Sequence, residues 1–179
     1  MRKILITGSG PYLLSWWKAH EHKLKEYEIH SINTSVLITK ENCERWWHSS
    51  DFYYFHPEIP QNIVSESVKI LPNVHEVVKY ERKDTSGTMF FNALQHLINE
   101  HIQEKNIQEV NVVCCDLIYE GDETHFYKGG TPDPLRLGEE LLLANINFFK
   151  EEYKKRGVGL YNLCPEGKKS LLNFERKCV

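Results

Sequence analysis

Residues Thr85-Ser86-Gly87-Thr88 join a polar loop to a long amphipathic segment, and their types suit the binding of an anion. The first N–H groups of a helix lack intrahelical partners and lie at the positive end of the helix dipole, so a phosphate or carboxylate can dock there. Glycine would let that ligand approach the backbone closely. The alternative is that a Thr or Ser hydroxyl only caps the helix.

A second loop of this kind follows the first predicted strand. Lys3 to Thr7 is a short apolar run typical of a buried parallel strand, and Gly8-Ser9-Gly10-Pro11-Tyr12-Leu13 follows it. The pattern resembles half of a dinucleotide fingerprint, but Leu13 replaces the third glycine and no acidic residue stands at the expected distance. It therefore favours a nucleotide or phosphate loop over an NAD site.

His125 is the best placed of the nine histidines to act as a general base. It follows the most strand-like segment of the chain, and the carboxylates of Asp116, Asp122 and Glu123 nearby would raise its basicity. The alternative is a surface or structural role for this side chain.

Apolar periodicity predicts alternating strands and helices that position these groups. The predicted strands are Lys3 to Thr7, Tyr27 to Asn33, Asp51 to Phe55, Val74 to Tyr80, Glu109 to Leu117 and Val158 to Leu163. The predicted helices are Leu14 to Lys25, Glu41 to Trp47, Val64 to Leu71, Ser86 to about Gln103 and Leu137 to Arg156, with Gly157 as a C-cap. This order predicts an α/β fold in one domain (1–179): a three-layer, Rossmann-like, mainly parallel sheet with helices on both faces.

Ligands of such sheets bind beyond the carboxyl ends of the strands. Polar groups follow the predicted strands at those ends, namely Gly8 to Gly10, Asn33 to Ser35, Phe55 to Pro57, Asp84 to Gly87, Asp116 to Tyr119 and Cys164 to Glu166. We therefore expect Gly8 to Gly10, Asn33, Ser86 and Asp116 to line one crevice. The alternative is that these loops are polar only because they face solvent.

The composition narrows the class of protein. With 179 residues, 41% of them hydrophobic, the chain is long enough to bury a core, and its net charge of -3 disfavours a nucleic-acid-binding surface. The five cysteines lack metal-ligand spacing, there is no Asp-x-Asp pair, and no run suits a signal peptide or a membrane span. The expectations are a cytoplasmic protein without a metal site or a membrane span.

The paired tryptophans Trp16-Trp17 and Trp46-Trp47 could stack on a base or a sugar. Neighbouring residues on a helix point in different directions, so we expect one member of each pair to lie in the core.

Several of these motifs together resemble small bacterial and phage sialyltransferase-like glycosyltransferases. The resemblance covers nearly the whole chain and rests on Ile6 to Leu13, Asn33, Tyr54 to Pro57, Thr85 to Gly87, Asp116 to Tyr119, His125 to Tyr127 and Leu160 to Pro165. It implies a Rossmann-like fold (a GT-A variant), a nucleotide-sugar donor such as a CMP-sugar carrying a sialic-acid-like sugar, a hydroxyl acceptor and no metal. Related proteins include some similar to a pterin pyrophosphokinase.

The resemblance implies a role for individual residues. Nucleotide or donor contacts would come from Gly8, Ser9, Gly10, Asn33, His56, Ser86, Gly87 and Asp116. Tyr119 would donate to the departing phosphate.

Two departures from the family pattern keep other functions open. Only Glu120 to Thr124 stand where the family has a long lid, and Gly129 aligns with the family's catalytic histidine. Either His125 has taken the role of the base or the chemistry differs. The alternatives to a glycosyltransferase are a pyrophosphokinase-like phosphate-transfer enzyme and a non-catalytic nucleotide-binding module.

Overall fold

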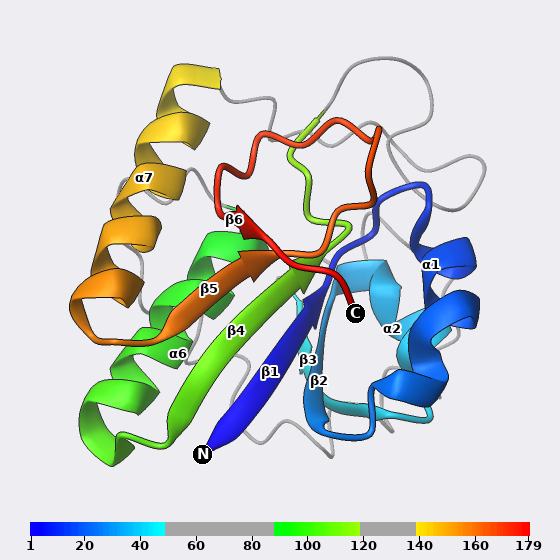
Figure 1. Cartoon of the computed structure of the whole chain (residues 1–179), viewed down its shortest axis with the longest axis horizontal. Coiled ribbons are helices and arrows are strands. Elements are labelled where there is room, and N and C mark those ends of the chain that lie inside the picture. The colour runs from blue at the N-terminus through cyan, green and yellow to red at the C-terminus, as the bar shows by residue number, and fades with distance from the viewer. Residues whose placement is uncertain (49–87, 119–138) are drawn as a thin grey trace.

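The computed structural model describes residues 1–48, 88–118 and 139–179, which form a six-stranded parallel sheet flanked by helices (Figure 1). Its strands are β1 (Arg2–Thr7), β2 (Tyr27–Ile32), β3 (Cys43–Trp47), β4 (Ile107–Val113), β5 (Gly159–Asn162) and β6 (Glu175–Arg176). Their order in the sheet is β3-β2-β1-β4-β5-β6, and all neighbours are parallel. This is the order of Rossmann-type folds, in which the strand order reverses between β1 and β4.

Helices cover both faces of the sheet, which confirms the predicted α/β fold. One face carries α1 (Leu13–His20) and α2 (Val36–Thr39), and the other carries α6 (Met89–Glu104) and α7 (Glu139–Lys155) (Figure 1). Two short 3-10 helices, η1 (Glu21–Lys23) and η2 (Asn33–Ser35), lie before and after β2.

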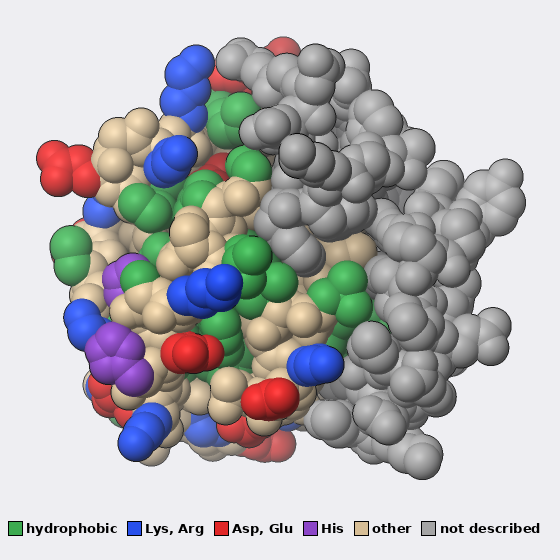
Figure 2. All heavy atoms as spheres, turned by 90° about the vertical axis from the view of Figure 1, so that its right-hand side faces the viewer, with side chains coloured by type: hydrophobic (Ala, Val, Ile, Leu, Met, Phe, Trp, Pro, Cys, Tyr) green, Lys and Arg blue, Asp and Glu red, His purple; other side chains and the backbone are tan. Residues whose placement is uncertain are grey.

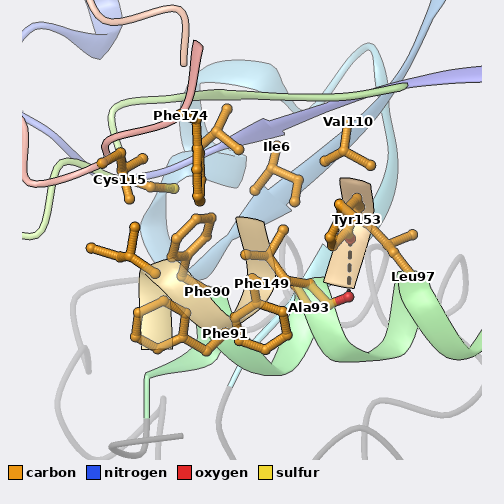
Figure 3. Packing of buried hydrophobic residues seen from close by; sticks show 14 of the residues in the cluster. Ile6, Phe90, Phe91, Ala93, Leu97, Val110, Cys115, Phe149, Tyr153 and Phe174 are labelled. Atoms are coloured by element: carbon orange, nitrogen blue, oxygen red, sulfur yellow. Dashed lines mark hydrogen bonds between the residues drawn. The ribbon is translucent and has the colours of Figure 1, made fainter. Parts of the chain in front are cut away.

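The alternation of side chains along β1 explains the two cores. Ile4 and Ile6 pack on the side of α6 and α7, whereas Leu5 packs on the side of α1, and all three are fully buried. On the α6 and α7 side, the rings of Phe91 and Phe149 stack with centroids 5.6 Å apart (Figure 3). These contacts fix both helices against the sheet.

The predicted helix from Glu41 to Trp47 is wrong, because β3 (Cys43–Trp47) pairs there with β2. Aromatic residues favour a strand that is covered on both sides, and alternation along the strand directs Trp46 and Trp47 to opposite faces. Both are buried, and so are Trp16 and Trp17, since α1 contacts α2 as well as the sheet. The expectation that one of each pair lies in the core is therefore also wrong.

Other element boundaries differ from the predicted ones by a few residues. Helix α6 begins at Met89 because the Thr88 hydroxyl caps it, accepting the Phe91 N–H at 3.4 Å. Strand β4 ends at Val113, and the residue that follows it, Cys114, has a left-handed φ of 59°. The sequence pattern did not predict α2 or β6, and the predicted Asp51 to Phe55, Val64 to Leu71 and Val74 to Tyr80 lie outside the described residues.

The predicted C-cap at Gly157 is confirmed. Its φ is 70°, and its N–H donates to the Lys154 carbonyl at 3.0 Å.

A network of charged groups ties three strands to α6. Arg2 on β1 donates two hydrogen bonds of 2.6 Å to the carboxylate of Glu28 on β2, and it also bonds Glu100 on α6. Arg45 on β3 donates to the same Glu100 at 2.8 Å. Glu28 and Glu100 therefore each face both arginines. Glu100 accepts hydrogen bonds from both, whereas Glu28 accepts them from Arg2 and lies 3.7 Å from Arg45.

His30 completes this network as a neutral side chain. Trp47 donates its indole N–H to His30 Nδ1 at 3.3 Å, so Nε2 carries the proton that bonds Glu28 at 2.8 Å. Burial lowers the pKa of His30 to about 4. Burial would raise the pKa of Glu28, but the hydrogen bonds from His30 and Arg2 outweigh it and hold that pKa well below its usual range.

We expect the free energy of unfolding to fall on acidification because His30 resists protonation in the folded state. An unfolded histidine takes up a proton near pH 6.5, whereas folded His30 does so only at about pH 4, so the unfolded state binds more protons between these values. The stability that is present above pH 6.5 should therefore decrease by about 3 kcal/mol as the pH reaches 4.

Urea unfolding of the wild type, His30→Gln and His22→Gln at several pH values in this window measures the effect. His22 is exposed, so its variant should keep the wild-type slope, and His30→Gln should lose most of it. Equal slopes for all three proteins would refute this account.

Candidate functional site

The loop from β1 to α1 meets the end of β4 at the carboxyl edge of the sheet. The N–H groups of Gly8 and Gly10 donate to the carbonyls of Val113 and Cys114 at 2.9 and 3.0 Å. A Cβ at Gly8 would lie 2.2 Å from the Cys114 carbonyl oxygen and 2.5 Å from Cys115 Sγ. Glycine is thus required here for the approach of two chain segments.

The next strand end contributes a second polar contact to this edge. Ser9 Oγ and Thr34 Oγ1 share a hydrogen bond of 2.8 Å. Asn33 beside them has a left-handed φ of 50°, and its carbonyl accepts the Trp46 indole N–H at 2.8 Å. Asn33 Oδ1 is buried and has no hydrogen-bond partner within the part of the chain that the structure describes. It is therefore an acceptor available to a donor group from elsewhere.

Asp116 follows the end of β4 and is held by hydrogen bonds at two points. Tyr12 donates its hydroxyl to Asp116 Oδ2 at 2.6 Å, and the Asp116 backbone carbonyl accepts the Leu171 N–H at 2.9 Å. The other carboxylate oxygen, Oδ1, is buried and finds no hydrogen-bond partner among residues 1–48, 88–118 and 139–179. A buried carboxylate oxygen without a donor is costly, so this atom marks a position that a ligand donor group would satisfy.

The groups around Asp116 stay protonated. Burial, followed by the neighbouring Cys114 and Asp116, raises the pKa of the Tyr12 hydroxyl far above its usual range, so this phenol acts as a donor. Burial likewise raises the pKa of the Cys114, Cys115 and Cys164 thiols. Because the thiolate is the reactive form, these cysteines are poor nucleophiles here.

The segment after β5 covers the other side of Asp116. Asn162 Oδ1 accepts the Cys164 N–H at 2.9 Å, and the chain then turns back so that Leu171 reaches Asp116. Lys168 and Lys169 are exposed on this turn. The sixth predicted strand end therefore contributes backbone support for Asp116.

The structure brings together every predicted site residue that it describes, namely Gly8, Ser9, Gly10, Asn33 and Asp116. The other predicted site residues, His56, Ser86, Gly87, Tyr119 and His125, lie outside the described residues. Sequence reasoning missed Tyr12 and Thr34, which bond two of the predicted residues. The signal for both was their position in the sequence. Tyr12 follows the glycine loop and Thr34 follows a strand, and the loops at this edge of the sheet lie close together.

A separate hollow of about 340 Å³ lies near the amino ends of β2 and β3, which Tyr27 and Cys43 begin. Trp17 and Leu24 also line it, together with three glutamates. On the side of the molecule that α1 faces, acidic and basic side chains are interspersed over the described surface (Figure 2). Because β2 and β3 begin beside the hollow and Asp116 follows the end of β4, the hollow and Asp116 lie at opposite edges of the parallel sheet.

Two further findings concern the described residues alone. No three His, Cys, Asp or Glu side chains among them are grouped so that they could hold a metal ion. None of the helices described has the length and apolar character needed to span a membrane.

Comparisons with protein-family models, with curated proteins and with solved structures found no match to this chain.

The close approach at Gly8 predicts a large loss of stability when a side chain is added. Gly8→Ala should lower the free energy of unfolding by about 3 kcal/mol, because its Cβ would collide with a backbone carbonyl that cannot move freely. Gly157→Ala is the matched control: its φ of 70° is strained for alanine, but nothing lies within 4 Å, so we expect a loss of about 1 kcal/mol. Chemical denaturation measures both values, and equal losses would contradict the close-approach explanation.

Proposed function

We propose that this chain is a metal-independent glycosyltransferase that binds a nucleotide-sugar donor at the carboxyl ends of β1 and β4 and transfers its sugar to a hydroxyl acceptor. The observation that supports this most is the placement of Asp116, which Tyr12 holds with one carboxylate oxygen buried and unpartnered beside the glycine loop. That position is the point where strand order reverses, the usual ligand site of open α/β sheets.

The chemistry of the unpartnered atoms favours a nucleoside. Asp116 Oδ1 and Asn33 Oδ1 are both acceptors, so they suit hydroxyl or amine groups such as those of a ribose or a base. A phosphate would be repelled by the Asp116 carboxylate.

Catalysis in this proposal uses residues implied by the resemblance to sialyltransferase-like enzymes. Ser86 and Gly87, just before α6, would hold the nucleotide phosphate, and His56 would contact the donor. Tyr119 would donate a proton or a hydrogen bond to the departing phosphate, and His125 would remove the proton from the acceptor hydroxyl.

A thermal-shift screen of nucleotides and nucleotide sugars in EDTA tests the binding part of the proposal. A ligand at about one hundred times its dissociation constant should stabilise the chain by about 2.7 kcal/mol. Asp116→Asn should weaken nucleotide binding about tenfold, because an acceptor oxygen is lost. Glu152→Gln on α7, far from this edge, is the control and should bind as the wild type does.

Turnover assays on the ligands that this screen identifies separate the alternatives. Slow hydrolysis of a nucleotide sugar in EDTA supports the transferase. A requirement for magnesium and ATP would instead indicate phosphate transfer, and binding without turnover would indicate a binding module. No stabilisation by any nucleotide would refute the proposal.

For the catalytic residues we expect separate effects on turnover and binding. His125→Ala should reduce transfer by about 10²- to 10⁴-fold while the dissociation constant of the nucleotide changes little, since a general base acts in the transition state. Tyr119→Phe should slow the same step because it removes a donor to developing charge. Transfer rates and calorimetric affinities of both variants, with His22→Ala as a surface control, provide the test. Full transfer by His125→Ala would leave this histidine without the proposed role.

A further inference from the structure

We infer that Tyr12 is a positioning residue that selects the nucleoside by fixing the direction of the Asp116 carboxylate. This inference rests on the proposed function, because it assigns a role within the same site. It goes beyond that function because it names the side chain that orients Asp116 Oδ1. It also names the ligand groups that can donate a hydrogen bond to this oxygen.

The backbone of Tyr12 is fixed on both sides. Pro11 precedes it, the Leu13 N–H donates to the Gly10 carbonyl at 3.0 Å, and the Tyr12 carbonyl accepts the Trp16 N–H at 3.0 Å. Its ring packs against the core cluster on the α1 side. The hydroxyl therefore stands at a defined position relative to the glycine loop and α1.

That hydroxyl donates to Asp116 Oδ2 at 2.6 Å, a short bond from a phenol that burial keeps protonated. The Cys164 thiol also interacts with this carboxylate, but a thiol is a much weaker donor than a phenol. The terminal torsion of an aspartate is soft, so a carboxylate without such a bond can turn about it. Once Oδ2 is fixed, Oδ1 points in one direction. Because Oδ1 is buried and unpartnered in the described part of the chain, that direction is where a donor is needed.

The group that satisfies Oδ1 must carry a hydrogen and must not be an anion. In a nucleotide, a ribose hydroxyl and an exocyclic amine of the base both have this chemistry, and a phosphate does not. The pair of Tyr12 and Asp116 thus acts as a filter for neutral hydrogen-bond donors on the nucleoside part of the ligand.

A double-mutant cycle on nucleotide affinity tests this role. The proteins are the wild type, Tyr12→Phe, Asp116→Ala and the double variant, each titrated calorimetrically with CMP, UMP, AMP and GMP. Tyr12→Phe keeps the ring and should weaken binding of the preferred nucleotide about tenfold, as expected for the loss of a hydrogen bond to a charged group. If Tyr12 acts through Asp116, the double variant should bind no more weakly than Asp116→Ala alone.

Tyr153→Phe is the matched control. Tyr153 on α7 is buried and donates its hydroxyl to the Leu94 carbonyl at 3.0 Å, the bond drawn as a dashed line in Figure 3. Its variant loses a buried tyrosine hydroxyl of the same kind, so it reports the effect of lower stability alone. Its nucleotide affinity should equal that of the wild type.

Comparison of CMP with 2′-deoxy-CMP and with UMP distinguishes the two sources of the donor. If the ribose 2′-hydroxyl is the donor, Tyr12→Phe should have no effect on 2′-deoxy-CMP. If the exocyclic amine is the donor, the effect should be absent for UMP. Either pattern supports the inference.

Three results would overturn the inference. One is wild-type affinity in Tyr12→Phe, and another is a double variant whose loss is the product of the single losses. Both would leave the proposed function standing, since the wild type still binds. The third is a wild type that binds none of the four nucleotides, which refutes the proposed function as well. Should Asp116→Ala not fold, Asp116→Asn takes its place in the cycle.

Discussion

The contact between the glycine loop and the end of β4 is the constraint on which the carboxyl edge of this protein depends. Gly8 and Gly10 donate to carbonyls of Val113 and Cys114, across the point where the strand order reverses. A side chain at residue 8 would collide with the Cys114 carbonyl, so the two segments could not approach this closely. The contact brings the start of α1 within reach of the residues after β4, and the hydrogen bond between Tyr12 and Asp116 becomes possible only at that separation.

Buried charged groups near the amino ends of β1, β2 and β3 are paired with one another. Near the amino ends, Glu28 and Glu100 are paired with arginines, and both ring nitrogens of His30 are used. A buried network of this kind is stable only when its members are satisfied. At the carboxyl ends, Asn33 Oδ1 and Asp116 Oδ1 have no partner among the residues described. Unpartnered buried oxygens are not confined to this edge, because Asn106 Oδ1 directly before β4 and Asn111 Oδ1 within it have none among the residues described. What distinguishes Asn33 and Asp116 is their place in loops at the carboxyl ends of the strands, where open α/β sheets bind ligands.

Local patterns in the sequence were enough to predict the α/β class, β1, the apolar stripe of α6 and the C-cap at Gly157. Residues 41–47 could not be predicted in this way, because the reason that β3 is a strand is its pairing with β2 and the cover on both of its faces. The pair of Tyr12 and Asp116 is separated by 104 residues, so only the folded sheet reveals it. Nucleotide contact by Gly8 and Gly10 stays a prediction, and the structure adds that both donate their N–H groups to carbonyls at the end of β4. The predicted roles of His56, Ser86, Gly87, Tyr119 and His125, which lie outside the described residues, stay predictions.

The use of the two glycine N–H groups also explains why this loop departs from a dinucleotide fingerprint. In that fingerprint the loop backbone approaches a pyrophosphate, and an acidic residue at the second strand binds the ribose. Here the N–H groups of Gly8 and Gly10 donate to Val113 at the end of β4 and to Cys114 after it, and the second strand is followed by Asn33 and Thr34. The acidic residue stands instead after β4, at Asp116, on the other side of the loop. This loop therefore lacks the free glycine N–H groups that would bind the pyrophosphate of NAD, and the end of β2 lacks the acidic residue that would bind its ribose. A ligand that places a nucleoside beside Asp116 matches the acceptor oxygen that remains available there, and the proposed nucleotide-sugar donor carries such a nucleoside.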